Sequence, residues 1–165
     1  MEVRKIMPAD DVAAIADIYV QSWKTAYRGI VPQDFLDKLD GNGWADFLRE
    51  GQCESYVVIK GNRRYMGTAS VCPAREKSMT GWGELVSLYL LPEAFGKGYA
   101  EPLFCAAMRG LLQMGYEEAY LWVLEENLRA QRFYEKQGFR KNGDRMEIAV
   151  GGKELVEIRY VKRIV

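Results

Sequence analysis

The sequence predicts a mixed α/β fold in which helices cover both faces of one sheet. Residues 85–91 and 119–124 are almost continuously apolar, as is typical of strands buried on both faces. Between them, small and apolar side chains recur at helical spacing from Ala100 to Leu111, and this pattern stops at Gly115. Strand, helix and strand in this order predict a central parallel unit with a right-handed crossover.

The first third of the chain predicts one strand and three helices. A strand over residues 3–7 should end at Pro8. An amphipathic helix should follow over about residues 10–25, because apolar side chains recur there every three or four positions. Two short helices are expected around residues 35–39 and 44–48, on either side of the Gly41-Asn42-Gly43 break.

The remaining elements complete the sheet. Residues 55–59 and 64–71 read as a hairpin rich in β-branched and aromatic residues, and a polar loop should follow over residues 73–80. A helix is predicted from Asn127 to Gly138, with Phe139 closing its end. Two final strands, about residues 146–150 and 155–161, flank the Gly151-Gly152 turn.

Length and charge restrict the class of protein. A chain of 165 residues predicts a single domain over residues 1–165. The 23 basic residues balance 23 acidic ones, so no basic field favours nucleic acid as a partner. Nowhere do 18 apolar residues follow one another, so the sequence predicts no membrane span.

Histidine and cysteine usage restricts the chemistry. The chain has no His, which excludes Ser-His-Asp and Cys-His nucleophile systems and His-ligated zinc. Cys53, Cys72 and Cys105 are widely spaced and form no Cys-x-x-Cys pair, so we expect reduced thiols, a cytoplasmic protein and no metal site.

The segment Pro92–Ala100 leads from a buried strand into a helix and carries Gly96 and Gly98. Glycines there let backbone N–H groups turn toward one point, and the first helical turn adds further unpaired donors. The segment therefore predicts an anion cradle, although a turn that merely needs positive φ is an equal alternative. Its spacing matches neither the phosphate loop that ends in Gly-Lys-Ser/Thr nor the three-glycine dinucleotide fingerprint.

Asn127 and Tyr134 lie seven residues apart, so two helical turns place them on nearly the same face. Either side chain can address one groove. Asn127 is equally well explained as a helix N-cap. The alternative for Tyr134 is a core tyrosine whose hydroxyl has found a partner.

Two segments resemble the GNAT family of N-acyltransferases. The stretch Pro92–Ala100 resembles its acetyl-CoA motif, Gln/Arg-x-x-Gly-x-Gly/Ala, with Phe95 where Gln or Arg is expected. The stretch Leu121–Phe139 resembles the family's strand, loop and helix that end in Ala-x-x-Phe-Tyr-x-x-x-Gly-Phe. A third match, at residues 22–32, resembles the Ser-Trp-x-x-Ala-Tyr-x-Gly-x-x-Pro start of one branch of the family.

The resemblance implies a GNAT-like, mostly antiparallel sheet of about seven strands and an N-acetyltransferase that uses acetyl-CoA. A small-molecule or peptide amine would attack the thioester directly in a ternary complex. In this reading Tyr134 protonates the departing thiolate, and Glu84 accepts the proton of the amine, unless it is a solvated residue at a strand end.

The resemblance also assigns the two binding sites. Trp23 and Tyr27 would line the amine site, although a purely structural place in the core is the stronger alternative for both aromatics. A backbone N–H near Leu88 to Leu90 would meet the thioester carbonyl. The implied acetyl-CoA site consists of Leu88, Tyr89, Leu90, Phe95, Gly96, Lys97, Gly98, Tyr99, Ala100 and Asn127. Phe95 would contribute a backbone donor in place of a polar side chain.

Two other functions stay open at this stage. The chain could be a CoA-binding regulatory module without turnover, or an interaction protein that keeps only the fold. Dimerisation through an exposed sheet edge or the terminal hairpin is equally open.

Overall fold

The computed structural model describes all 165 residues and contains one seven-stranded sheet, with strands in the order β1-β2-β3-β4-β5-β7-β6. Only β4 and β5 are parallel neighbours. The mostly antiparallel sheet with a central parallel unit is thereby confirmed. The strands are β1 (Glu2–Lys5), β2 (Glu54–Lys60), β3 (Arg64–Pro73), β4 (Gly83–Leu90), β5 (Glu118–Leu124), β6 (Arg140–Val150) and β7 (Lys153–Arg163).

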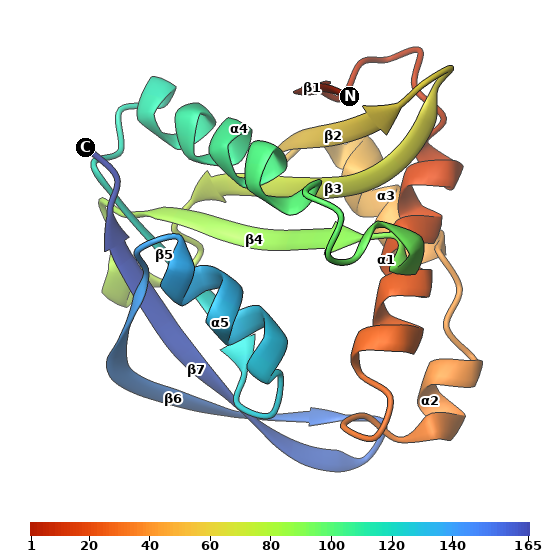
Figure 1. Cartoon of the computed structure of the whole chain (residues 1–165). Helices are drawn as coiled ribbons and strands as arrows, with labels where there is room; N and C mark the ends of the chain where they lie inside the picture. Colours follow the sequence, from red (N-terminus) through yellow and green to blue (C-terminus); the bar gives the residue numbers. More distant parts are fainter.

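Helices lie on both faces of the sheet, with α4 and α5 on one face and α1 and α3 on the other (Figure 1). Two 3-10 turns lie in loops that border the central strand. No helix is both long and apolar enough to cross a membrane. The helices and turns are α1 (Val12–Ala26), α2 (Gln33–Asp37), α3 (Asn42–Glu50), η1 (Lys77–Met79), η2 (Pro92–Ala94), α4 (Ala100–Gln113) and α5 (Leu128–Lys136).

The main core lies between the sheet and the helices α4 and α5. Leu103, Ala107 and Leu111 recur on one face of α4 and are fully buried against the sheet. Cys105 is a free, partly buried thiol that packs against the same cluster. The core therefore fixes the start of α4 relative to the end of β4.

Capping hydrogen bonds fix the start of α1 and the end of α5. Asp11 caps α1 by accepting a hydrogen bond from the Ala14 amide. Gly138, at φ 89°, ends α5, and the Phe139 amide returns to the Tyr134 carbonyl at 3.0 Å, as in a Schellman cap. Phe139 is buried, so the cap also anchors α5 to the core.

Three expectations about element boundaries were wrong. The first strand spans Glu2–Lys5 and so ends before Pro8. The strand β6 begins at Arg140 rather than near residue 146, because it is an edge strand whose exposed side chains show no apolar alternation. The helix α3 begins at Asn42, inside the predicted break, where the Asp40 carboxylate accepts a hydrogen bond from the Asn42 amide. The polar loop predicted before β4 is present, and it contains η1, whose Met79 is buried.

Candidate active site

The strands β4 and β5 separate soon after they meet. Only Gly83 and Glu84 of β4 have partners on β5, namely Ala119 and Tyr120. A register shift between β3 and β4 near Val86 adds one residue to β4 at the point where the two strands part. From Leu85 onward the edge of β4 that faces β5 has no strand partner, which leaves an opening in the middle of the sheet.

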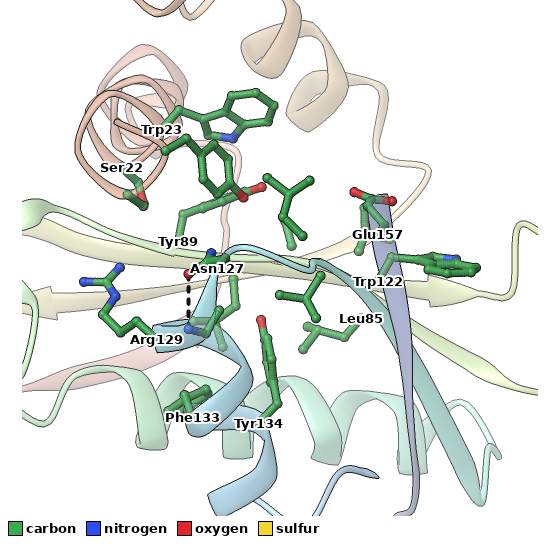
Figure 2. A pocket seen from close by; sticks show the side chains of 18 of the residues that line it. Ser22, Trp23, Leu85, Tyr89, Trp122, Asn127, Arg129, Phe133, Tyr134 and Glu157 are labelled. Carbon is green, nitrogen blue, oxygen red and sulfur yellow. Dashed lines mark hydrogen bonds between the residues drawn. The ribbon is translucent and has the colours of Figure 1, made fainter. Parts of the chain in front are cut away.

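A cavity of about 480 Å³ occupies this opening. Its lining includes Gly96 and Ala100 from the segment that leads into α4, Trp23 from α1 and Trp122 from β5. Figure 2 shows the start of α5 on one side of the cavity, with Trp23 of α1 and Glu157 of β7 on other sides. The cavity therefore lies in the middle of the sheet and is lined by α1, α5, β4, β5 and β7.

The loop before α4 carries backbone donors that the protein leaves unused. Gly96 (φ 70°) and Gly98 (φ 79°) adopt the left-handed conformation that favours glycine. The amides of Gly96, Gly98, Tyr99 and Ala100 have no acceptor within the protein, and no side chain caps α4. Such unpaired amides at a helix start can bind an anion.

Two amides of this loop differ from expectation. The Phe95 amide donates to the Pro92 carbonyl and the Lys97 amide to the Ala94 carbonyl, each at 3.2 Å. Both are therefore used inside the turn, and the expected backbone donor at Phe95 is already occupied. Lys97 and Gly98 are exposed beside the cavity, whereas Tyr99 is buried in the core.

The Phe95 ring instead supports a cation. The guanidinium of Arg129, in the first turn of α5, lies over this ring, and both residues line the cavity. Partial burial lowers the pKa of the Arg129 guanidinium from its ordinary value. Sequence reasoning missed Arg129, because its pairing with Phe95 joins two segments that are far apart in the chain.

Asn127 caps α5 and also lines the cavity. Its Oδ1 accepts a hydrogen bond from the Ala130 amide at 3.2 Å, which confirms the N-cap. The Nδ2 donors have no partner in the protein and remain free for a ligand. The two roles weighed for Asn127 are therefore compatible.

Tyr134 lies on α5 with its hydroxyl directed into the cavity (Figure 2). Its ring packs against Phe133 and Phe139. The side chain is only 9% exposed, and this burial raises the pKa of the phenol, which stays protonated at neutral pH. No hydrogen bond within the protein uses the hydroxyl, so its proton is free to be donated.

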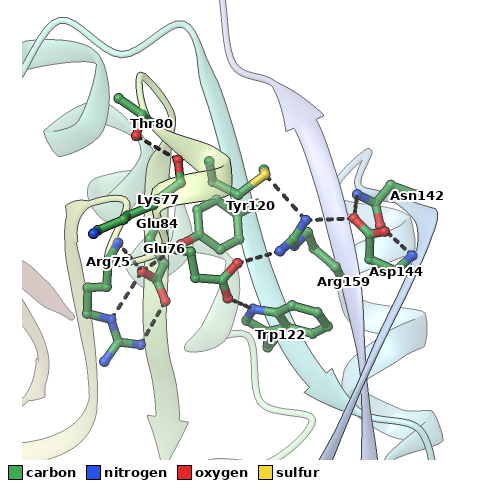
Figure 3. Close-up of polar contacts among 11 residues, drawn as sticks. Arg75, Glu76, Lys77, Thr80, Glu84, Tyr120, Trp122, Asn142, Asp144 and Arg159 are labelled. Carbon is green, nitrogen blue, oxygen red and sulfur yellow. Dashed lines mark hydrogen bonds and ion pairs between the residues drawn. The ribbon is translucent and has the colours of Figure 1, made fainter.

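Glu84 lies where β4 and β5 begin to part, and its carboxylate is heavily bound (Figure 3). It accepts hydrogen bonds from the Arg75 amide and guanidinium, at 2.7 to 3.1 Å, and from the Tyr120 hydroxyl at 2.9 Å. Burial acts to raise its pKa, but these donors prevail and leave the pKa lowered. A carboxylate so stabilised in its charged form is a weak proton acceptor.

A second polar group beside Glu84 ties the η1 loop to the far half of the sheet. The buried guanidinium of Arg159, on β7, binds Glu76 and Asp144, and the Trp122 indole also donates to Glu76 (Figure 3). Glu76 lines the cavity but is fully engaged in these contacts. The network positions the loop that carries Arg75.

Trp23 and Tyr27 of α1 both line the far end of the cavity. Their rings meet edge to face, with centroids 4.7 Å apart. The Trp23 Nε1 is buried without any hydrogen-bond acceptor, and burial raises the pKa of Tyr27. Leu88, Tyr89 and Leu90 line the cavity from β4.

Glu157 of β7 is a cavity residue that the sequence did not reveal. It stands in a mostly apolar strand from Leu155 to Tyr160, and that acidic interruption is the one signal that could have singled it out. Its nearest neighbours across the sheet are Leu124 and Met146. No His, Cys, Asp and Glu side chains are grouped so that they could hold a metal ion.

Comparison with known proteins identifies this arrangement. The model of the acetyltransferase (GNAT) family matches residues 12–139, which include the diverging strands, the amide-rich loop and α5. The chain belongs to the GNAT family. It is accordingly an acyltransferase, as the matching segments of the sequence implied.

Individual GNAT relatives agree with this. The Bacillus subtilis protein described as uncharacterized N-acetyltransferase YuaI is 31% identical over 119 residues, which are 72% of this chain and 69% of that protein. A spermidine N(1)-acetyltransferase of Thermoplasma acidophilum is 23% identical over 165 residues, covering 97% and 98% of the two chains. The structure of yncA from Salmonella typhimurium with acetyl-CoA has a TM-score of 0.76 at 19% identity, over 99% of this chain and 94% of that one, and shows a common fold.

Proposed function

We propose that this GNAT protein transfers an acetyl group from acetyl-CoA to a primary amine, by direct attack in a ternary complex. The observation that carries the proposal is the cavity between β4 and β5, which is lined both by the loop with unused amides and by aromatic and acidic side chains. Two substrates that both bind there can meet in its centre. One cavity that both substrates can share supports direct transfer without a covalent enzyme intermediate.

The residues at the α4 end suit the donor. Acetyl-CoA supplies the acetyl group as a thioester, and its diphosphate needs several hydrogen-bond donors. We assign the free amides of Gly96, Gly98, Tyr99 and Ala100 to that task, with Arg129 as the nearby cation. Their lack of internal acceptors supports this fit.

The exposed edge of β4 suits the arm of the donor. Leu88, Tyr89 and Leu90 lie beyond the last residue of β4 that pairs with β5. An extended amide chain can add to such an edge as a further strand would. We therefore propose that this edge and the Nδ2 of Asn127 hold the pantetheine arm, and that a β4 amide supports the thioester carbonyl.

Tyr134 is the proposed general acid. Its protonated hydroxyl enters the cavity and has no competing partner in the protein. The raised pKa keeps the proton on the phenol until charge develops on the thiolate, and exclusion of water strengthens the interaction at that moment.

We propose a positioning role for Glu84 in place of the proton-acceptor role that the family resemblance implied. Its bonds to Arg75 and Tyr120 hold it in the charged form, so we propose that it positions Arg75 at the end of the cavity.

Trp23 and Tyr27 are proposed to form part of the amine site on the opposite wall. The spermidine acetyltransferase relative supports an amine as the acceptor. The free thiols are consistent with the proposed cytoplasmic location.

The proposed function is tested in two steps. Saturating acetyl-CoA should raise the melting temperature of the protein, because it binds the folded state alone. Mass spectrometry should then detect acetylated products from a panel of primary amines, each of which appears only in the presence of enzyme. A thermal shift without any product would favour a CoA-binding module, and no shift at all would favour an interaction protein.

A further inference from the structure

Three carboxylates line the cavity, and two of them are already engaged. Glu84 is bound by Arg75 and Tyr120, and Glu76 is bound by Arg159 and Trp122. Glu157 has neither a salt bridge nor a hydrogen bond within the protein. It is therefore the one cavity carboxylate that is free to interact with a substrate.

The surroundings of Glu157 favour its uncharged form. The side chain is partly buried, and its flanking strands place Leu124 and Met146 beside it. Removal from water raises its pKa, the charge of Glu76 raises it further, and Arg75 partly opposes both effects. Glu84 and the phenols of Tyr27 and Tyr89 are the other ionisable groups on this part of the wall.

Trp23 supplies an independent sign that a polar ligand belongs here. Its Nε1 is buried in the cavity wall near the Tyr89 hydroxyl and makes no well-formed hydrogen bond. Buried donors without acceptors are rare in folded proteins, because leaving one unpaired costs free energy. An unused donor and an unused carboxylate thus line one end of the same cavity.

Resting on the proposed acetyl transfer, we propose that Glu157 accepts the proton of the incoming amine, and that the acidic wall around it selects amines without a neighbouring carboxylate. An ammonium ion cannot attack a carbonyl until it loses one of its three protons. Glu157 takes that proton and passes it to solvent. The C–N bond then forms as the C–S bond breaks, a second proton reaches sulfur through Tyr134, and the third stays on the amide nitrogen.

The selection follows from charge. Glu76, Glu84 and Glu157 face this end of the cavity, with Arg75 as the nearby cation, since Arg129 stacks on Phe95 at the donor end. Arg75 is itself held by Glu84. A carboxylate on the substrate would meet like charges without a free cation, whereas an ammonium group is attracted.

The substrate test compares amines that differ by one carboxylate. 2-Phenylethylamine is paired with phenylalanine, and 1,4-diaminobutane with ornithine, each added to enzyme saturated with CoA. Tryptophan fluorescence reports binding, because Trp23 and Trp122 line the cavity. The amine of each pair should bind about 10-fold or more tightly than its amino acid. Equal or tighter binding of the amino acids would overturn the selection.

The proton-acceptor role is tested with Glu157→Gln and the matched control Glu154→Gln, an exposed residue of the same strand outside the cavity. For Glu157→Gln, kcat/KM for the amine should fall by about 100-fold at neutral pH. The loss should shrink as pH approaches the pKa of the amine, where the substrate is already neutral. Glu154→Gln should match the wild type throughout.

The outcomes separate this inference from the proposed function. If wild-type protein acetylates amines and Glu157→Gln keeps the wild-type pH profile, Glu157 is not the proton acceptor, although the acetyltransferase stands. If acetyl-CoA neither stabilises nor reacts with the wild type, the proposed function itself fails and the inference falls with it. An unchanged thermal shift by acetyl-CoA in Glu157→Gln shows that the donor site is intact.

Discussion

The guanidinium carbon of Arg129 lies 3.7 Å from the centroid of the Phe95 ring. This contact joins the start of α5 to the loop before α4, on the two sides of the donor end of the cavity. Phe95 occupies the motif position where the family usually has Gln or Arg. The structure thus places a cation beside that position from another element, and the aromatic ring orients it.

Arg129→Gln should therefore weaken acetyl-CoA binding by about 10-fold, which corresponds to the loss of one charge-assisted contact. Because the contact is to the donor, KM for acetyl-CoA should rise while kcat changes little. Steady-state kinetics at low and high salt provide the measurement, and the salt dependence should decrease in the variant. Arg132→Gln, an exposed residue of the same helix outside the cavity, should behave like the wild type. Equal effects of both substitutions would remove Arg129 from the donor site.

Tyr134→Phe should lower kcat by about 100-fold, because the general acid is lost while the ring remains. The melting temperature and the affinity for acetyl-CoA should stay near those of the wild type, since no hydrogen bond within the protein is broken. Tyr120→Phe is the matched control: its hydroxyl donates to Glu84, so its removal should cost about 1 kcal/mol of unfolding free energy. Undiminished turnover at saturating acetyl-CoA in Tyr134→Phe would show that the hydroxyl takes no part in the reaction.

The parts of the fold that could be predicted are those that local pattern decides. The buried runs of β4 and β5, the apolar face of α4 and the Gly138 cap each follow from residues close in sequence. The β6 strand could not be predicted over residues 140–145, because an exposed edge strand imposes no alternation of apolar and polar side chains.

The same reasoning explains which site residues could be predicted. Gly98 and Tyr134 lie within short motifs, so their spacing alone points to a site. Arg129 and Glu157 acquire their roles from tertiary structure: the first from its contact with Phe95, the second from its place in the wall of the cavity. The bonds that occupy Glu84 also arise from tertiary structure, which is why sequence reasoning could place this carboxylate at the site but could not judge its basicity.

Gly98→Ala and Gly115→Ala separate backbone strain from ligand binding. Both glycines have positive φ, 79° and 95°, and a Cβ at either position would meet no atom within 4 Å. Each substitution should lower the unfolding free energy by about 1–2 kcal/mol, because a non-glycine residue is strained in this conformation. They lie at opposite ends of α4, and only Gly98 adjoins the free amides.

Acetyl-CoA should therefore raise the melting temperature of Gly115→Ala as much as that of the wild type, and should raise that of Gly98→Ala less. The comparison needs only thermal unfolding with and without acetyl-CoA, at equal ligand concentrations. An equal gain in both variants would mean that the loop amides do not hold the donor.

Glu84→Gln should destabilise the protein at neutral pH by about 2–3 kcal/mol. The substitution replaces the charged acceptor of Arg75 and Tyr120 with a buried neutral amide. This loss of stability is smaller than for a fully buried ion pair, because the Arg75 side chain is 60% exposed and water can solvate it. Glu126→Gln, at an exposed position, is the control and should be neutral. Denaturant unfolding provides the measurement.

The pH dependence of that difference has a definite sign. Because the pKa of Glu84 is lowered on folding, its contribution is fully present above the unfolded value of about 4.3 and is lost as pH falls through the folded value. The stability gap between wild type and Glu84→Gln should therefore close in acid. A gap that is independent of pH would mean that the charge of Glu84 does not matter. If instead the acid limb of the pH–rate profile disappears in Glu84→Gln while Glu157→Gln retains it, the proton acceptor is Glu84 despite its bonds to Arg75.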